Sequence, residues 1–200
     1  MRRYIIPYSL LSIILIFLTT SCGTQKTQGG LLYDPDEVTE LSARLGIPLS
    51  NINRDDVKNM PLYAEVSRWL GIPYRYAGLS RKGVDCSGFV YLVYRKVYGI
   101  TIPRSTSALS NMKMRKISKN NLKTGDLVFF ATSKHLNRIN HVGIYLKDGC
   151  FIHASTSKGV IVSHLDENYY GRTWKNNFHL SDLQNFTRKE YYNGQRFGNE

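Results

Sequence analysis

The sequence predicts an α+β fold in which N-terminal helices pack on a small antiparallel sheet. In the first half of the chain, apolar residues recur at helical spacing. In the second half, short β-branched or aromatic runs are separated by Gly, Lys, Asp and Ser. Because the helices come first and the strands follow, each strand can pair with its neighbour along the chain. With 200 residues, of which 42% are hydrophobic, the chain is about one domain long and can bury a core.

Residues 1–21 have the features of a lipoprotein signal peptide. A basic start is followed by an aliphatic run that ends at Leu18 and is shorter than the ~20 apolar residues of a bilayer-spanning helix. Small polar residues then lead to Cys22, which resembles the lipidated cysteine of bacterial lipoproteins, although Thr19 replaces the usual aliphatic residue. The alternative is an ordinary signal peptide with an incidental cysteine. Residues 22–30 are polar and Gly-rich and are expected to form a flexible tether from the membrane.

Three helices are predicted ahead of the strands. The first begins after an N-cap at Asp34, has an acidic first turn and ends at Gly46. The second is expected to begin at Pro61, because proline is favoured in the first turn of a helix, and to end at Gly71. The third covers residues 86–98 and is followed by a glycine.

The strands and the domain boundaries complete the predicted organisation. Four strands are expected, over Asp126–Ala131, His141–Leu146, Cys150–Ser155 and Gly159–Leu165. We expect a helical extension over residues 31–60 and the main domain over residues 61–185. Residues 186–200 show no periodicity and are expected to form a disordered tail.

Cys86 is the first candidate for chemistry. It directly precedes an apolar helix, where unpaired backbone N–H groups and the positive end of the helix dipole stabilise a thiolate. We therefore expect a lowered thiol pKa. The small residues Ser87 and Gly88 leave this end of the helix open to a substrate. The alternative is a buried structural cysteine, which is the commoner role of a free cysteine.

Two histidines are candidates for the partners of the thiol. A nucleophilic thiol needs a base, and the base needs a group that orients it. His141 opens one predicted strand and His153 lies within the next, so the two imidazoles can lie side by side. Strand alternation places Cys150 on the face opposite His153, so we expect Cys86 and Cys150 to be free thiols. A zinc site is disfavoured because these residues lack paired short spacing. The other histidines are expected at the surface, namely His135, His164 and His179.

The charge balance is strongly basic. The chain has 27 Lys and Arg against 15 Asp and Glu, a formal net charge of +12. Such a surface favours anionic partners, such as nucleic acid, anionic lipid or an acidic wall polymer, although it can also serve solubility alone. No nucleic-acid-binding motif accompanies the charge, so nucleic acid is not an expected partner.

Six short motifs follow one another in an order that resembles the NlpC-type peptidoglycan cysteine peptidases. The resemblance covers about residues 62–180. Within this family, the chain is most similar to the small lipoprotein murein endopeptidases, which share the lipidated start. The motifs are Pro73–Gly78, Gly83–Val90, Pro103–Thr106, Lys123–Phe130, His141–Leu146 and Phe151–Val162.

The resemblance implies a papain-like α+β fold and a specific set of site residues. It implies a catalytic triad of Cys86, His141 and His153, with no cofactor and no metal. It also implies a substrate role for Tyr74, near the oxyanion site. Two further substrate-binding residues are implied where some relatives bind a free amine of the stem peptide, Asp85 and Ser87. Two departures are visible. Tyr76-Ala77-Gly78 stands where many members have Trp-Gly-Gly, and the loop over residues 132–140 is basic and can bear on substrate choice.

We therefore expect a cell-wall hydrolase, a lipid-anchored cysteine endopeptidase that cleaves D-alanyl–diaminopimelate crosslinks in peptidoglycan. The expected location is the outer membrane, facing the periplasm, with a lipid anchor at Cys22. One alternative is cleavage of the γ-D-glutamyl–diaminopimelate bond within a stem peptide. A second is a catalytically silent wall-binding module on the same scaffold. A third is a lipid acyltransferase on a related fold, but such relatives place the histidine before the cysteine in the chain. The sequence does not specify an oligomeric state.

Overall fold

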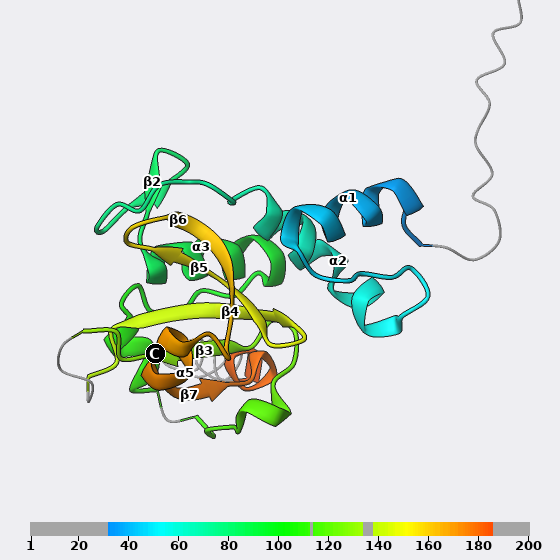
Figure 1. Cartoon of the computed structure of the whole chain (residues 1–200). Coiled ribbons are helices and arrows are strands. Elements are labelled where there is room, and N and C mark those ends of the chain that lie inside the picture. The colour runs from blue at the N-terminus through cyan, green and yellow to red at the C-terminus, as the bar shows by residue number, and fades with distance from the viewer. Residues whose placement is uncertain (1–31, 113, 134–137, 186–200) are drawn as a thin grey trace, which may run out of the picture. The chain divides into compact units, whose positions relative to one another are not determined.

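The computed structural model describes residues 32–112, 114–133 and 138–185 (Figure 1). The expected signal peptide over residues 1–21, the tether over residues 22–30, Cys22 and the tail over residues 186–200 lie outside the described residues. In the part of the chain that is described, no helix has both the length and the apolar character needed to cross a bilayer.

The fold is α+β, as the sequence predicts. Its centre is a five-stranded antiparallel sheet with strand order β6-β5-β4-β3-β7, and a small antiparallel hairpin, β1-β2, lies apart from it (Figure 1). The strands are β1 (Leu79–Ser80), β2 (Gly83–Val84), β3 (Leu127–Phe130), β4 (His141–Lys147), β5 (Cys150–Ser155), β6 (Gly159–His164) and β7 (Trp174–Phe178). The helices are α1 (Pro35–Leu45), α2 (Arg54–Ser67), α3 (Cys86–Tyr98), α4 (Thr106–Ser110) and α5 (Asn168–Thr173), with a 3₁₀ turn at Lys119–Asn121.

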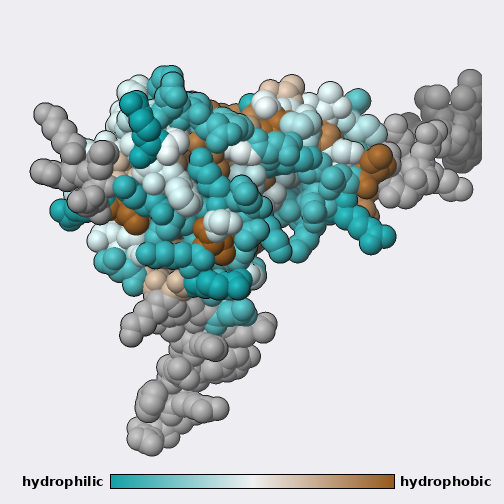
Figure 2. Space-filling model, turned by 60° about the horizontal axis from the view of Figure 1, so that its bottom comes forward, coloured by the Kyte–Doolittle hydropathy of each residue, from teal (hydrophilic) through white to brown (hydrophobic). Residues whose placement is uncertain are grey.

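Two hydrophobic clusters follow from the alternation of side chains along the strands. In β5, Ile152 and Ala154 join the larger cluster with the buried residues of α1, α2 and α3. Phe151 belongs to the smaller cluster, together with Tyr170 of α5. The predicted two-faced pattern of this strand is therefore confirmed. The surface turned forward in Figure 2 is mostly hydrophilic, with only small hydrophobic patches.

The first and third predicted helices are confirmed. The Asp34 side chain caps α1 by accepting a hydrogen bond from the Asp36 amide at 2.8 Å, and Gly46 ends the helix in the left-handed region with a φ of 65°. Helix α3 covers residues 86–98 as expected, and Gly99 ends it with a φ of 67°.

The second predicted helix is wrong at both ends. Helix α2 begins at Arg54, because the Asn53 side chain caps it by accepting from the Asp55 and Asp56 amides. Pro61 therefore lies inside the helix, where it costs one backbone hydrogen bond without ending the helix. The helix stops at Ser67, before the predicted end.

Strand β7 was not predicted, because its sequence WKNNF lacks an apolar alternation. Asn177 is fully buried there, and its polar atoms are nevertheless paired. Its side-chain oxygen accepts from the Trp174 indole at 2.9 Å, and its side-chain amide donates to the Ile117 carbonyl at 3.3 Å. A buried asparagine is thus tolerated in an edge strand because its hydrogen bonds are made.

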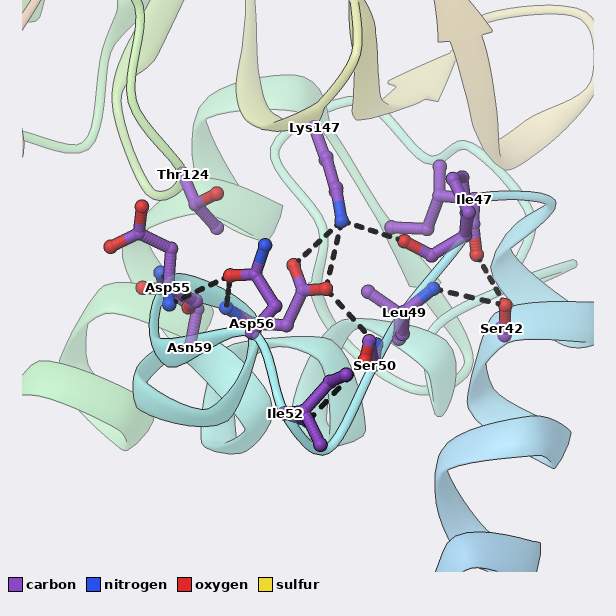
Figure 3. A network of polar contacts seen from close by, with 12 residues as sticks. Ser42, Ile47, Leu49, Ser50, Ile52, Asp55, Asp56, Asn59, Thr124 and Lys147 are labelled. Atoms are coloured by element: carbon purple, nitrogen blue, oxygen red, sulfur yellow. Dashed lines mark hydrogen bonds and ion pairs between the residues drawn. The ribbon is translucent and has the colours of Figure 1, made fainter.

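The segment between α1 and α2 is fixed to the end of β4 by an ion pair between half-buried Lys147 and buried Asp56 (Figure 3). The Lys147 ammonium lies 2.8 and 2.9 Å from the two carboxylate oxygens of Asp56, which is only 2% exposed. It also donates to the Pro48 carbonyl at 2.8 Å, and the Ser50 amide donates to the same carboxylate at 3.0 Å. Every charge in this network therefore has several partners.

Candidate active site

Cys86 is the first residue of α3, and its thiol faces the start of β4. The preceding residue, Asp85, caps the helix and accepts from the Gly88 amide at 2.6 Å. The thiol sulfur lies 3.4 Å from the Thr106 hydroxyl and 4.0 Å from the Asn140 carbonyl oxygen. The backbone amide of Val142 also hydrogen-bonds to it. The thiol therefore contacts the residues on both sides of His141.

The two histidines lie on the neighbouring strands β4 and β5, and their rings touch. Nε2 of His141 is 2.9 Å from Nδ1 of His153, with the rings nearly perpendicular. Both residues are buried, at 7% and 1% exposure. This is the side-by-side placement that the sequence predicts. Because Nε2 of His141 is occupied by His153, Nδ1 is the nitrogen left for another partner.

The far side of His153 contacts hydroxyl groups. Its Nε2 lies 3.0 Å from the Tyr170 hydroxyl and 3.4 Å from the Ser163 hydroxyl. Tyr170 was not a candidate from the sequence, because α5 shows neither helical periodicity nor an apolar run. Its role follows only from the packing of α5 against the sheet.

Burial sets the protonation states at this site. It lowers the pKa of His141 to about 4, and burial together with the neighbouring His141 lowers that of His153 to about 2. Burial also raises the pKa of the Cys86 thiol, although hydrogen bonds from Thr106 and the backbone act in the opposite direction. The predicted lowering of the thiol pKa is therefore wrong, because a thiolate that is cut off from water loses its hydration. At neutral pH the group consists of a thiol and two neutral imidazoles.

A groove of about 620 Å³ opens beside the thiol. It is lined by all four residues that the sequence places near a substrate, Tyr74, Asp85, Cys86 and Ser87. A second hollow of about 290 Å³ is lined by the two histidines, by Tyr170 and by several hydroxyl residues of the β5–β6 hairpin. The nucleophile candidate and the imidazoles are thus each accessible from a depression in the surface.

Tyr74 is half-buried in the wall of the groove. Burial raises the pKa of its phenol, and the proximity of Cys86 and Asp85 raises it further. The phenol therefore keeps its proton at neutral pH and can donate a hydrogen bond into the groove.

The same wall contains a strained backbone position. Ala77 has a φ of 57°, a left-handed conformation that favours glycine, and it lines the groove. The next residue must be glycine, because a Cβ atom on Gly78 would lie 2.4 Å from the Gly83 carbonyl oxygen. Ala77 thus stands where many members of the resembling family have glycine. At this φ, alanine costs conformational energy that glycine does not.

Asp85 and Ser87 are already engaged within the protein. The Arg104 guanidinium lies 3.2 and 3.4 Å from the two oxygens of the Asp85 carboxylate. The Ser87 hydroxyl donates to the Arg104 carbonyl at 2.7 Å. A substrate amine at this position has to share the carboxylate with the arginine.

The remaining cysteines and histidines lie elsewhere. Cys150 is half-buried beside the larger hydrophobic cluster, and it and Cys86 are free thiols, as expected. His179 differs from its expected surface position, because its ring is 2.8 Å from the buried Asp126 carboxylate and its side chain is 13% exposed. His164 is partly exposed, and His135 lies outside the described residues. Among the described residues, no group of three His, Cys, Asp or Glu side chains is arranged to hold a metal ion.

Comparison with known proteins identifies relatives of this site. Residues 71–178 match the NlpC/P60 family. Over 178 residues the chain is 35% identical to the murein DD-endopeptidase MepS/murein LD-carboxypeptidase of Escherichia coli K12, covering 86% of this chain and 90% of that protein. It is 44% identical over 108 residues to the probable endopeptidase NlpC homolog of Haemophilus influenzae, of which it spans about half, 55%. A crystal structure of an NlpC/P60 family protein from Bacillus cereus superimposes with a TM-score of 0.55 and 34% identity, over 62% of this chain and 40% of that one.

Proposed function

This chain belongs to the NlpC/P60 family, and on that premise we propose that it is a cysteine peptidase that hydrolyses peptide bonds in bacterial peptidoglycan. The observation that carries the proposal is that the Cys86 sulfur, at the start of α3, contacts the backbone on both sides of His141, whose buried ring is paired with His153. A thiol, a base and a group that orients the base are the three parts that nucleophilic catalysis requires. They come from three elements that the tertiary fold brings together.

In the proposed mechanism His141 acts as the base. Its Nδ1 takes the proton of the Cys86 thiol while the sulfur attacks the carbonyl carbon of the scissile peptide bond. The carbonyl π electrons move to oxygen, and when they return the C–N bond breaks. The leaving amine takes the proton from His141, and a thioester remains on Cys86. Water then attacks the thioester, its proton passes through His141, and the sulfur leaves as the thiol.

The oxyanion of this reaction needs hydrogen-bond donors close to the sulfur. The Ser87 backbone amide lies in the first turn of α3 and hydrogen-bonds to the Cys86 sulfur, so it points at the reacting centre. The Gly88 amide is already bound to Asp85. The Tyr74 phenol, which also lines the groove, is the second candidate donor, because its raised pKa keeps it protonated.

For the bond that is cut, we favour the D-alanyl–diaminopimelate crosslink between stem peptides. The similarity to the Escherichia coli murein DD-endopeptidase extends over 90% of that protein, well beyond the region of the nucleophile. The alternative, a γ-D-glutamyl–diaminopimelate bond in a stem with a free amine, needs an acceptor for that amine. Asp85 is the expected acceptor, but its carboxylate is paired with Arg104. A crosslinked substrate makes no such demand.

Defined muropeptides test the bond specificity. The full chain is incubated separately with crosslinked dimers and with uncrosslinked tetrapeptides, and the products are identified by mass spectrometry. We expect monomers to be released from the dimers. Dipeptides released from uncrosslinked stems, with the dimers left intact, assign the γ-D-glutamyl bond instead. The Cys86→Ala variant is the control and should be inactive on both substrates.

We also propose that Cys22 carries acyl chains and holds the enzyme at the outer membrane, facing the periplasm. Small polar residues before Cys22 support lipoprotein processing, and two or more acyl chains give stable membrane binding where one is marginal. The test compares wild type with Cys22→Ser by membrane fractionation and by mass spectrometry of the N-terminus. We expect only the wild type to carry lipid. A native protein with an unmodified, soluble N-terminus excludes the anchor.

A further inference from the structure

The hydrogen-bond chain at the active site does not stop at His153. Beyond it, Nε2 of His153 is 3.0 Å from the Tyr170 hydroxyl, whereas the Ser163 hydroxyl is more distant at 3.4 Å. The Tyr170 hydroxyl also hydrogen-bonds to Ser163. Both residues are buried, at 8% and 7% exposure. The imidazole pair thus ends on two hydroxyl groups that are sheltered from bulk water.

The positions of the protons along this chain decide whether His141 can act as a base. To accept a proton from Cys86, Nδ1 of His141 must carry a lone pair, so the proton of the neutral ring sits on Nε2. That proton is donated to Nδ1 of His153 across 2.9 Å. Because both rings are neutral, His153 must then carry its own proton on Nε2, and this proton needs an acceptor.

The Tyr170 oxygen is in the right place to be that acceptor. Its own proton can be directed to Ser163, which leaves an oxygen lone pair for Nε2 of His153. The position of the His153 ring is fixed by packing, because Phe151 stacks on it with a centroid distance of 5.0 Å and Tyr170 meets it edge-on at 5.2 Å. A ring that cannot turn away depends on this acceptor for its tautomer.

We propose that Tyr170, supported by Ser163, is a positioning residue that fixes the tautomer of His153 and so keeps Nδ1 of His141 free to take the thiol proton. This inference rests on the proposed peptidase function. Without the Tyr170 hydroxyl, the proton on Nε2 of His153 has only the more distant Ser163 hydroxyl as a partner, at 3.4 Å, and the reversed proton order becomes competitive. In that order Nδ1 of His141 is protonated, and it faces the thiol as a donor instead of a base.

The test is Tyr170→Phe in the full chain, which removes the hydroxyl and keeps the aromatic ring. We expect kcat on purified peptidoglycan to fall roughly 10-fold with KM unchanged, by analogy with metal-ligating histidines that lose their outer hydrogen-bond partner. Because Ser163 can partly substitute, Tyr170→Phe/Ser163→Ala should lose more than the single variant. The ¹⁵N NMR signals of His141 and His153 should shift from one tautomer toward a mixture.

Tyr145→Phe is the matched control. It also removes one tyrosine hydroxyl with one hydrogen bond, from the Gly149 amide at 3.0 Å, but it does not touch the histidines. We expect its kcat and its histidine spectra to match the wild type. The inference is overturned if Tyr170→Phe retains the wild-type tautomers, whether its kcat falls or not. The spectra need no turnover, so this outcome is distinct from failure of the peptidase function, which appears as a wild-type protein without activity on peptidoglycan.

Discussion

Strand β4 has a polar network at each of its ends, one buried and one half-buried, and the two networks are built differently. At its first residue, His141 contacts the imidazole of His153, which in turn contacts the Tyr170 hydroxyl. None of these three side chains is charged at neutral pH, because burial lowers the pKa of both histidines. At its last residue, Lys147 is charged and pairs with the buried carboxylate of Asp56.

The difference in charge between the two networks matches their different roles. A buried ion pair with several hydrogen bonds on each charge is held in one arrangement, because either partner alone leaves an uncompensated charge. The Lys147–Asp56 pair can therefore hold the segment before α2 against the sheet. A network of neutral rings and hydroxyls holds no fixed charge, so its proton order is set by hydrogen bonds and its first ring can still accept a proton. It suits a base that must gain and lose a proton in each catalytic cycle.

The largest effect, a loss of turnover, is expected from replacing Cys86 or the histidines beside it. Cys86→Ala should lower turnover of purified peptidoglycan by at least about 10³-fold, because the nucleophile is lost. His141→Ala should be nearly as severe, and His153→Ala milder, because His153 orients the base and does not take the thiol proton. All three should stay folded by circular dichroism. Wild-type turnover by Cys86→Ala would refute the mechanism.

The second network should respond in stability and not in catalysis. Lys147→Met leaves the Asp56 carboxylate buried without its cation, so we expect the free energy of unfolding to fall by about 3 kcal/mol. The double variant Asp56→Leu/Lys147→Met should recover much of this loss, because it removes both charges. Urea unfolding measures both values. If the single variant lost turnover while its stability was unchanged, the contrast between the two networks would fail.

Acid should lower the free energy of unfolding, because the buried neutral imidazole of His141 resists protonation in the folded protein. The pKa of His141 is about 4 in the folded protein and about 6.5 when unfolded, so between these values the unfolded chain binds more protons. Stability therefore falls as the pH drops from 6.5 to 4, by about 3 kcal/mol for this residue. Urea unfolding at several pH values should show a weaker pH dependence in His141→Asn than in wild type. An equal dependence in both proteins contradicts the buried neutral imidazole.

The smallest effect concerns the wall of the groove beside the thiol. Ala77→Gly should raise the free energy of unfolding by about 1 kcal/mol, because glycine adopts the φ of 57° without strain. The matched control is Ala64→Gly inside α2, where the same substitution should lower stability by about 1 kcal/mol. Thermal and urea unfolding measure the opposite signs. Destabilisation by both variants would show that Ala77 is not strained in solution.

The sequence by itself determined the parts of the site that depend on near neighbours. Helix α3 and the place of Cys86 at its start follow from apolar spacing and from Gly99, all within one short segment. The pairing of His141 with His153 follows from two adjacent strands and a short turn between them. The faces of β5 follow from strict alternation along that strand.

Only the tertiary structure decided the features that depend on distant contacts and on burial. The sequence places Cys86 at a helix start but cannot say that this residue is only 7% exposed, and this burial reverses the expected direction of the shift in its thiol pKa. The start of α2 was misplaced because Pro61 imitates a first turn, whereas the cap at Asn53 is the true start. Tyr170 lies 17 positions after His153, in a helix without helical periodicity, and reaches it only because α5 packs against the sheet. Local patterns fix which residues share an element, but solvent exclusion and the partners of a buried proton are properties of the whole packed domain.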